Sequence, residues 1–392
     1  MDPIVIIGAG LGGLTVAREL RQLSPDVAIT LVTQDDAHQY PKPMLSTALR
    51  LGKRPDDLIR ARAEELRALG IEVLARRSVV KLEPEAKRLT LDDGSTLAYR
   101  DLVLATGASP FVPEVAGARD AVLTVNHLDD YRRFRDALHA EAPVLLIGGG
   151  LIGMEFASDL LASGHTVHVV DPGPGPLPRL LPPSAGALVT TALEQVGGTF
   201  HWGRTLSSLE RLSDRTLRAK LSDGTELIVG TVLSAVGLRP NAQLAKDAGL
   251  PVGRGVRLDA QLKAHAHVYA LGDCAEFESG LYLPFIKPIG EQARHIARAL
   301  TSGQDTPFAM TNYAITVKIA QWAVATTTPL PGEHGTWDEV VHDRGSLSRL
   351  RDDEGRVLRV VATGSETASL ARWLQEVPVL SAQQALSAAS PR

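Results

Sequence analysis

The sequence predicts an α/β protein with two parallel-sheet domains and a small α+β domain at the C-terminal end. Two observations support this prediction. A strand-like run, a glycine-rich turn and a helical pattern follow one another near the N-terminus, and the same succession returns about 140 residues later. In addition, 392 residues exceed the usual size of one domain, so two or three domains with substantial apolar cores are expected.

The composition excludes several classes of partner. A formal net charge of -4 leaves no basic excess to hold nucleic acid or an anionic membrane surface. The start, MDPIVIIGAG, has neither the cationic region nor the continuous apolar stretch of a secretory signal, and no run of 18 apolar residues occurs. We therefore expect a cytoplasmic protein whose partners are small molecules or another protein.

The chain contains one cysteine, Cys274. It therefore has no disulfide framework, no Cys-x-x-Cys redox pair and no thiolate cluster for zinc or iron–sulfur, and no metal site is expected. Any electron transfer must use a bound cofactor.

The first unit reads IVIIGAGLGGLTVAREL, with Gly8, Gly10 and Gly13 between a β-branched strand and a helix. This spacing permits the tight turn, the close approach to a pyrophosphate and the helix–strand contact of a Rossmann-like dinucleotide fold. The next strand, AITLVTQDD, brings Asp35 and Asp36 to the place where a ribose hydroxyl is usually bound. The alternative is a glycine-rich turn that binds nothing, and the strand–turn–helix context favours the dinucleotide site.

The second unit, APVLLIGGGLIGMEFASDLLASGHTVHVVDP, repeats the spacing with Gly148, Gly150 and Gly153 and closes with Asp171. Two dinucleotide sites are therefore expected. An acidic side chain at the end of this strand accepts hydrogen bonds from a 2′-hydroxyl and repels a 2′-phosphate, and no arginine follows before Arg179, which favours NADH over NADPH. The alternative is that Asp171 only opens the turn DPGPGP.

Three shorter motifs complete the pattern. DLVLATGASP (101–110) and TVLSAVGLRPN (231–241) each lead an apolar strand into a glycine turn, as expected where the chain crosses between dinucleotide domains. VYALGDCAE is a strand ending in Gly272 and Asp273, and this carboxylate could bind a polyol such as the ribityl chain of a flavin. Alone, Asp273 would be read as a turn or N-cap residue.

Together, both glycine motifs, ATG, GLRPN and YALGDCAE resemble the flavoprotein reductases of the glutathione-reductase-like fold, which carry two dinucleotide domains. Within that group, YPKPMLS, GLIGMEFASDL and ITVK (315–318) resemble rubredoxin reductases and flavorubredoxin reductases, over about residues 3–320. The landmarks predict an FAD domain from residues 1–110 and 242–310, an NADH domain from 111–241, and a C-terminal domain from 311–392 that covers the flavin or meets the acceptor.

The resemblance implies the cofactors FAD and NADH and a set of cofactor-binding positions. They are Gly8, Gly10, Leu11, Gly12, Gly13, Gln34, Asp35, Lys42, Val79, Thr106, Gly107, Gly148, Gly150, Ile152, Gly153, Glu155, Asp171, Gly237, Gly272, Asp273, Ile286 and Lys318. It also implies that Glu155 lies near the nicotinamide and Lys318 near the flavin, with Lys42 and Glu155 as catalytic residues. The alternatives are a solvated helix residue for Glu155 and a surface charge for Lys318.

Lys42 lies between two prolines in HQYPKPMLSTAL. Pro41 and Pro43 fix their own φ and bias Tyr40 and Lys42 toward extended conformations, so the lysine is expected on a stiff support. An ammonium near the flavin N5 edge would favour the electron-rich reduced form. The alternative is a surface lysine in a proline-bounded turn.

The acceptor is expected to be a small electron-transfer protein similar to rubredoxin. Disulfide reductases of this fold carry a cysteine pair and the related oxidases a reactive cysteine, and this chain has neither, which points to an external one-electron acceptor. Residues 319–336 fit the family pattern poorly, so other acceptors stay open: the ferredoxin of an oxygenase, nitrite or a quinone. A further alternative is an NADH-responsive binding role like that of apoptosis-inducing-factor-like proteins.

Two expectations concern the whole chain and its end. A monomer or a homodimer is expected. The final stretch, SAQQALSAASPR, is rich in small and polar residues and is expected to fray, whereas ETASLARWLQEV upstream has a helical pattern.

Overall fold

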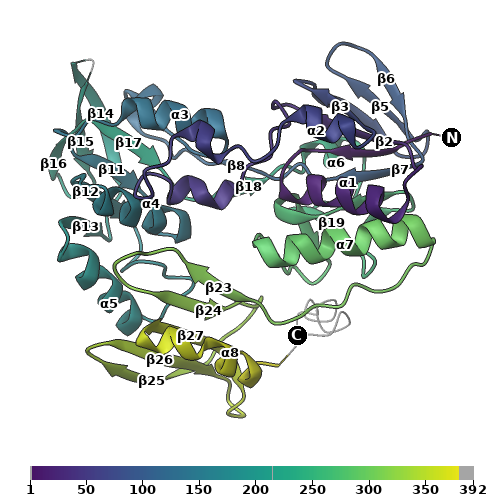
Figure 1. Cartoon of the computed structure of the whole chain (residues 1–392). Helices are drawn as coiled ribbons and strands as arrows, with labels where there is room; N and C mark the ends of the chain where they lie inside the picture. Colours follow the sequence, from purple (N-terminus) through teal and green to yellow (C-terminus); the bar gives the residue numbers. More distant parts are fainter. Residues whose placement is uncertain (1, 214, 379–392) are drawn as a thin grey trace.

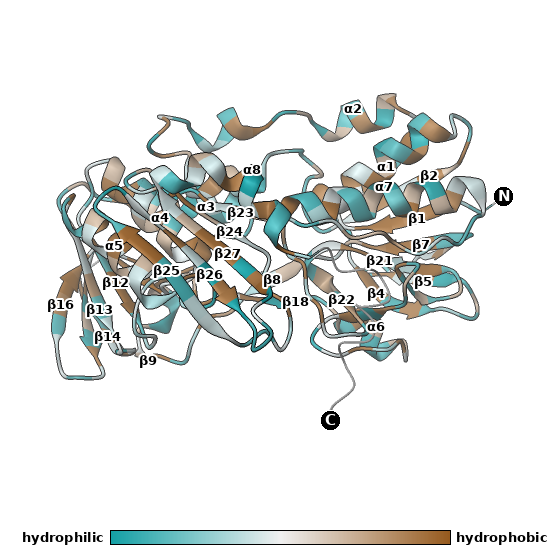
Figure 2. Cartoon of the chain, turned by 90° about the horizontal axis from the view of Figure 1, so that it is seen from below, coloured by the Kyte–Doolittle hydropathy of each residue, from teal (hydrophilic) through white to brown (hydrophobic). Residues whose placement is uncertain are grey.

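The computed structural model describes residues 2–213 and 215–378, so the stretch SAQQALSAASPR lies outside the described residues. The chain forms three units: an N-terminal one, a second one in the middle of the sequence, and a C-terminal sheet below them in the view of Figure 1. Figure 2 shows brown, hydrophobic segments on several strands of the sheets, while hydrophilic and hydrophobic residues alternate along α1 and α7. None of the helices in the described residues is long and apolar enough to cross a membrane.

The first unit is built on a six-stranded sheet with the order β20-β21-β7-β1-β2-β3, parallel except at β20. Its strands are β1 (Ile4–Ile7), β2 (Ile29–Thr33), β3 (Ile71–Ala75), β7 (Asp101–Leu104), β20 (Lys263–His265) and β21 (Val268–Ala270). Helices α1 (Leu11–Leu23) and α7 (Ile286–Ser302) lie against each other, with α2 (Ala63–Ala68) and α6 (Gln243–Asp247) nearby. A three-stranded sheet, β4 (Val79–Glu83), β5 (Arg88–Leu91) and β6 (Thr96–Ala98), and the pair β19 (Val256–Leu258) and β22 (Ala275–Phe277) complete it.

The second unit has a five-stranded parallel sheet with the order β10-β17-β11-β12-β13. Its strands are β10 (Val122–Leu123), β11 (Val144–Ile147), β12 (Val167–Asp171), β13 (Gly198–Trp202) and β17 (Thr231–Ser234), and its helices are α3 (Leu128–Ala137), α4 (Leu151–Ala162) and α5 (Pro183–Glu194). A four-stranded sheet joins β9 (Ala116–Gly117), β14 (Leu206–Ser213), β15 (Thr216–Leu221) and β16 (Glu226–Val229). The two crossovers, β8 (Ala108–Pro110) and β18 (Leu238–Pro240), pair antiparallel between the units.

The C-terminal unit is a five-stranded antiparallel sheet with the order β23-β24-β27-β26-β25. Its strands are β23 (Ala314–Val317), β24 (Val324–Thr327), β25 (Thr336–His342), β26 (Gly345–Arg351) and β27 (Val357–Gly364). The stretch ETASLARWLQEV, predicted as helical, is broken into short pieces. The helix α8 (Leu370–Trp373) lies between two 3₁₀ turns, Ser365–Ser369 and Leu374–Glu376. This sheet shares its buried core with α4 and α5 of the second unit, through residues such as Val361 and Val189.

Residues 42–58 leave the first unit and lie on the second, beside α3 and α4 (Figure 1). Leu45, Ala48 and Leu58 are buried in the same core as Tyr131 and Phe134 of α3. The segment thus belongs by sequence to the predicted FAD domain and by packing to the unit built around the second glycine motif. The domain boundaries themselves stay a prediction.

Candidate functional site

The two glycine-rich turns have the same geometry. Gly8 and Gly148 follow β1 and β11 with φ of 111° and 112°, a region that favours glycine. A Cβ on Gly13 would lie 1.9 Å from the carbonyl oxygen of Gly8, and one on Gly153 would lie 2.0 Å from that of Gly148. Only glycine therefore lets each helix approach its strand. In each sheet the turn lies where the strand order reverses, which is the ligand-binding position of a doubly wound fold.

Open space lies in front of both helix N-termini. Gly10 and Gly150 are the N-caps of α1 and α4, and a Cβ on either would meet no protein atom within 4 Å. Neither φ is positive, so the backbone does not require glycine there. Large apolar side chains beside the first turn are exposed, Leu11 by 46% and Ile286 by 54%. A free hollow before a helix N-terminus fits the pyrophosphate of a dinucleotide, so the residues present fit FAD at the first turn and NADH at the second.

The two carboxylates predicted to bind ribose, Asp35 and Asp171, are held differently. One oxygen of Asp35, after β2, accepts hydrogen bonds from the Thr33 hydroxyl at 2.8 Å and the Ala37 amide at 2.9 Å, and the other has no hydrogen bond within the described residues. Asp171 accepts from the amide of Gly149 at 2.7 Å and from that of Gly173 at 2.6 Å. Asp171 therefore does open a turn, and it also fixes the second glycine loop, leaving lone pairs on both oxygens.

The crossovers meet through an amide side chain that sequence reasoning missed. The Asn241 side-chain amide donates to the carbonyl of Thr106 at 2.8 Å, and the Thr106 hydroxyl donates to the carbonyl of Asn241 at 2.8 Å. The two neighbouring glycines, Gly107 and Gly237, have φ of 66° and 118°, and no atom would contact a Cβ on either within 4 Å. The motif GLRPN contained the signal for Asn241.

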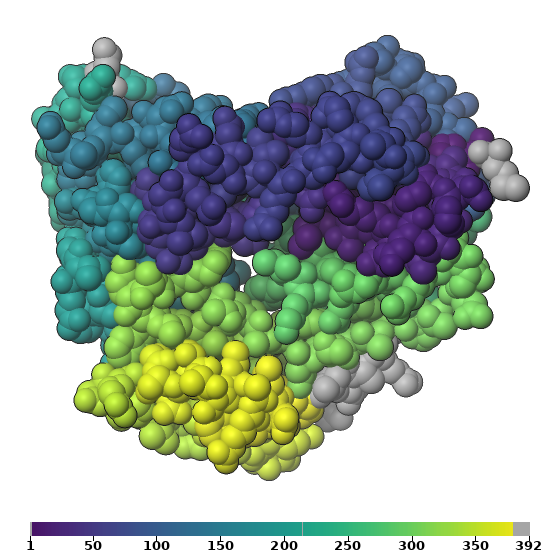
Figure 3. Space-filling view, viewed as in Figure 1, coloured from purple at the N-terminus to yellow at the C-terminus, as the bar shows by residue number. Residues whose placement is uncertain are grey.

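The charges of Lys42 and Asp273 act on each other. Burial lowers the pKa of Lys42 and raises that of Asp273, and each charge partly offsets the shift of the other. Neither side chain forms a hydrogen bond within the described residues, although Asp273 is half-buried. Lys42 is solvent-accessible, and neighbouring protein still removes enough water from its ammonium to lower the pKa. Figure 3 shows the molecule hollowed where its three units meet.

The backbone around these two groups is fixed by neighbours. Lys42 is not extended, as the prolines predicted, but begins a 3₁₀ helix, Lys42–Ser46, with Pro43 in its first turn. Pro43 is tolerated at this position because the first turn of a helix does not use the amide that proline lacks. The prediction of an extended Lys42 was therefore wrong. On the other side, the amide of Gly272 donates to the side chain of Gln292 at 3.0 Å, which holds the turn before Asp273. Sequence reasoning missed Gln292.

Glu155 and Lys318 form an ion pair where the three units meet. Glu155 lies on α4 and is 3% exposed, so it is not a solvated helix residue. Lys318 directly follows β23 and also donates to the Ser46 hydroxyl at 3.0 Å and to the Pro43 carbonyl at 2.7 Å. The Ser46 hydroxyl donates to Glu155 at 2.6 Å, and the Lys318 amide donates to the other Glu155 oxygen at 3.0 Å. Ser46 was not among the predicted site residues.

Within the described residues, the remaining predicted positions form no hydrogen bond or ion pair with Glu155, Lys318 or Ser46. Gln34 is exposed after β2, Val79 begins β4, and Ile152 lies in the first turn of α4. Gly12 is buried, and a Cβ there would approach Leu271 at 3.0 Å. Its role is therefore helix packing against the strand end before Asp273.

Cys274 is fully buried next to Asp273. Its thiol donates to the carbonyl oxygens of Leu104 at 3.4 Å and Leu271 at 3.3 Å, and burial raises its pKa. A buried protonated thiol is a poor nucleophile.

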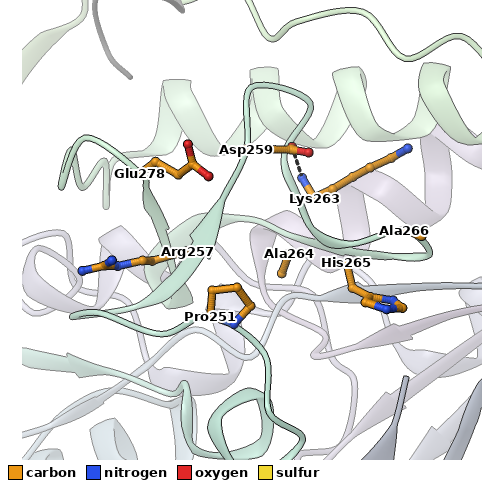
Figure 4. A pocket seen from close by; sticks show the side chains of 8 residues that line it. All are labelled: Pro251, Arg257, Asp259, Lys263, Ala264, His265, Ala266 and Glu278. Carbon is orange, nitrogen blue, oxygen red and sulfur yellow. Dashed lines mark hydrogen bonds between the residues drawn. The ribbon is translucent and has the colours of Figure 1, made fainter. Parts of the chain in front are cut away.

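A separate cavity of about 510 Å³ lies on the first unit (Figure 4). Its wall includes Arg257, Asp259, Lys263, His265 and Glu278, none of which is among the predicted cofactor residues. Lys263 is already paired with Asp305 at 2.7 Å.

The chain matches known proteins over most of its length. Residues 2–305 match the family described as pyridine nucleotide-disulphide oxidoreductase. The rubredoxin-NAD(+) reductase of Alcanivorax borkumensis is 37% identical over 383 residues, which are 97% of this chain and 100% of that protein. The nitric oxide reductase FlRd-NAD(+) reductase of Pectobacterium atrosepticum is 34% identical over 93% of this chain and 96% of its own. The reductase in the covalent putidaredoxin reductase–putidaredoxin complex superposes with a TM-score of 0.86 at 25% identity, covering 95% of this chain and 92% of that one.

Proposed function

The chain belongs to the pyridine nucleotide-disulphide oxidoreductase family, and we propose that it passes electrons from NADH through FAD to a small one-electron carrier protein, rubredoxin in the first place. Membership confirms the predicted family, fold class and cofactors, FAD and NAD(H). The identity of the acceptor, the roles of individual residues, action in the cytoplasm, and a monomeric or homodimeric state are part of the proposal.

One observation supports the proposal most. The chain has two glycine turns of the same geometry, and the junction of its units contains charged side chains but no reactive thiol. The groups at the junction are Lys42, Asp273, Glu155 and Lys318, and the one cysteine is buried and protonated. A disulfide substrate would need a thiol relay. A protein that accepts single electrons needs only a cofactor held near the surface.

The residues of the chain bind and orient the two dinucleotides. The free amides at the N-termini of α1 and α4, beyond Gly10 and Gly150, would hold the pyrophosphates, and Asp35 and Asp171 would accept ribose hydroxyls. When bound, FAD supplies the acceptor for a hydride of NADH and releases the two electrons singly. The contribution of the protein would be to hold the nicotinamide and flavin rings in the right relative orientation.

Charged residues would complete the site. The Lys42 ammonium would donate a hydrogen bond and favour a negative charge beside it, and Asp273 would accept hydrogen bonds from a polyol chain. Glu155, Lys318 and Ser46 would hold the units together beside the nicotinamide, since Glu155 and Ser46 are buried and bond to each other and to Lys318.

Rubredoxin is preferred as the acceptor because a relative that is 37% identical over 97% of this chain is named a rubredoxin-NAD(+) reductase. The putidaredoxin reductase complex favours the same class of partner, a small electron carrier, on the same fold. The ferredoxin of an oxygenase is therefore the first alternative that the test must separate.

The test is a panel of purified acceptors supplied to the FAD-loaded protein with NADH: rubredoxin, a [2Fe–2S] ferredoxin, glutathione disulfide and thioredoxin. We expect the highest kcat/KM with rubredoxin and no turnover with either disulfide. Cys274→Ser should keep the rubredoxin activity within about twofold, because its thiol only donates to two carbonyls. Robust disulfide reduction, or faster turnover with the ferredoxin, would overturn the proposal.

A further inference from the structure

Three polar side chains form one buried face of α4. Glu155, Ser158 and Asp159 lie at positions i, i+3 and i+4, and their exposed fractions are 3%, 0% and 2%. Residues at this spacing project from the same side of a helix. We call them the polar face of α4.

Each member of the polar face binds a different segment. Glu155 binds Lys318 and Ser46, as described above. Ser158 accepts the amide of Ala320 at 2.8 Å and donates to the side chain of Gln321 at 2.6 Å. Ser158 therefore fixes the chain just after Lys318.

Asp159 binds the segment that carries Lys42. Its two oxygens accept the amides of Leu49 at 3.1 Å and Arg50 at 3.0 Å, and the Arg50 guanidinium lies 3.7 Å away. Each oxygen of the buried Asp159 carboxylate thus accepts a hydrogen bond from a backbone amide of the same turn. Charge-assisted bonds of this kind are stronger than neutral ones.

Between Lys42 and Leu49 the backbone is short and internally bonded. The amide of Met44 donates to the Pro41 carbonyl at 2.7 Å, and that of Thr47 donates to the Met44 carbonyl at 3.0 Å. The Ser46 hydroxyl is also 3.2 Å from the Pro43 carbonyl. Holding Leu49 therefore restricts Lys42.

We propose that Asp159 is the positioning residue for Lys42: by binding the Leu49 and Arg50 amides it fixes the turn that carries the Lys42 ammonium. Through Asp159, α4, which starts at the second glycine turn, would thereby fix the position of the Lys42 ammonium near the first glycine turn. This inference rests on the proposed role of Lys42 near the flavin. Asp159 itself acts through another residue, because it is 2% exposed and both of its oxygens are bonded to the Leu49 and Arg50 amides.

The test compares Asp159→Asn with Asp136→Asn, an exposed aspartate on α3 that serves as the matched control. In Asn, one acceptor becomes a donor, so one of the two amides loses its partner. Hydrogen exchange of residues 45–53 is measured with and without FAD, and the flavin potential and the rate of reduction at saturating NADH are measured in both variants and in Lys42→Met.

For Asp159→Asn we expect at least tenfold faster exchange at Leu49 or Arg50, a five- to twentyfold slower reduction, and a KM for NADH within twofold of wild type. In the Lys42→Met background the same substitution should no longer slow reduction, because contacting or coupled residues are not additive. Asp136→Asn should change none of these. If Asp159→Asn does not fold, Asp159→Glu, which keeps the carboxylate on a longer stem, is measured in the same way and should give a smaller change in the same direction.

Three results would overturn the proposal, and they differ in what they say of the function. Additive effects of Asp159→Asn and Lys42→Met, or unchanged exchange, would show that Asp159 does not position Lys42. An unchanged potential and rate in Lys42→Met itself would remove the role of Lys42, and the exchange data would then still report whether Asp159 holds the turn.

Discussion

The Lys318 ammonium, at the end of β23, is bonded to the buried carboxylate of Glu155 on α4. The pair joins the C-terminal sheet to the unit built around the second glycine turn, and through Ser46 it reaches the segment that carries Lys42. One ion pair thus connects all three units at the junction where the two dinucleotides are proposed to meet.

Removing one partner of this pair should cost stability. In Lys318→Met the Glu155 carboxylate keeps the Ser46 hydroxyl and one amide but loses its cation, so we expect a loss of about 1–3 kcal/mol, below the cost of a fully buried pair since Lys318 is partly exposed. Urea unfolding of the FAD-loaded protein measures it. Glu155→Gln in the same chain should recover most of the loss, and a double variant no more stable than Lys318→Met would contradict this account of the pair.

Alanine at the two open glycines should separate cofactor binding from folding. Because a Cβ on Gly10 or Gly150 meets no protein atom within 4 Å, the thermal midpoint without cofactor should stay within about 2 °C of wild type. The methyl group would enter the pyrophosphate hollow, so Gly10→Ala should weaken FAD binding and Gly150→Ala should raise the KM for NADH, each by at least about tenfold or 1.4 kcal/mol.

Gly175→Ala is the control for Gly10→Ala, since a Cβ there also meets no atom within 4 Å and the residue lies in the DPGPGP turn after Asp171, not in the first glycine turn. Fluorescence titration with FAD and steady-state kinetics with NADH provide the readouts. Normal affinity in either variant would mean that the corresponding dinucleotide does not lie against that helix.

The coenzyme preference should follow from Asp171. The carboxylate is fixed by the Gly149 and Gly173 amides and would repel a 2′-phosphate, so kcat/KM for NADH should exceed that for NADPH by at least about tenfold. Asp171→Asn should reduce the ratio and also disturb the loop. Equal kcat/KM values for the two coenzymes in the wild type would show that Asp171 does not read the ribose.

The charge of Lys42 should appear in the pH profile. Burial lowers the pKa of its ammonium, with Asp273 opposing the shift, and a lysine is charged below its pKa. The rate of reduction by NADH should therefore fall as pH rises, at a pH below that of an ordinary lysine at about 10.4. Lys42→Met should lack this limb and be slower throughout the range.

The flavin potential of Lys42→Met should also be lower than that of wild type. If the reduced flavin is destabilised by about 1.4 kcal/mol, the two-electron potential falls by about 30 mV. A redox titration of both proteins measures this shift. A profile and potential identical to wild type would make Lys42 a solvated bystander.

The sequence predicted the parts that depend on local patterns. The Gly8 and Gly148 turns and their strands follow from spacing and strand periodicity, which act over a few residues. The 3₁₀ helix at Lys42 did not follow, because tertiary contacts of Leu45 and Ala48 with α3 and α4 fix that backbone against the preference of a residue before proline.

The junction could be predicted only through resemblance. Glu155 and Lys318 are 163 positions apart, and no local rule indicates that they pair. Ser46, Gln292 and Asp159 were missed for the same reason: a serine, a glutamine and an aspartate on helical or turn positions are read as surface residues until the fold shows what they bind.

The most direct test of the central claim is anaerobic double-mixing stopped flow with the FAD-loaded protein, NADH and rubredoxin. One equivalent of NADH should bleach the flavin absorbance, and the second mixing should restore it while two rubredoxins are reduced for each NADH, since NADH carries two electrons and rubredoxin accepts one. A flavin that NADH does not bleach, or a bleached flavin that rubredoxin leaves unchanged over the time of a turnover, would contradict the account.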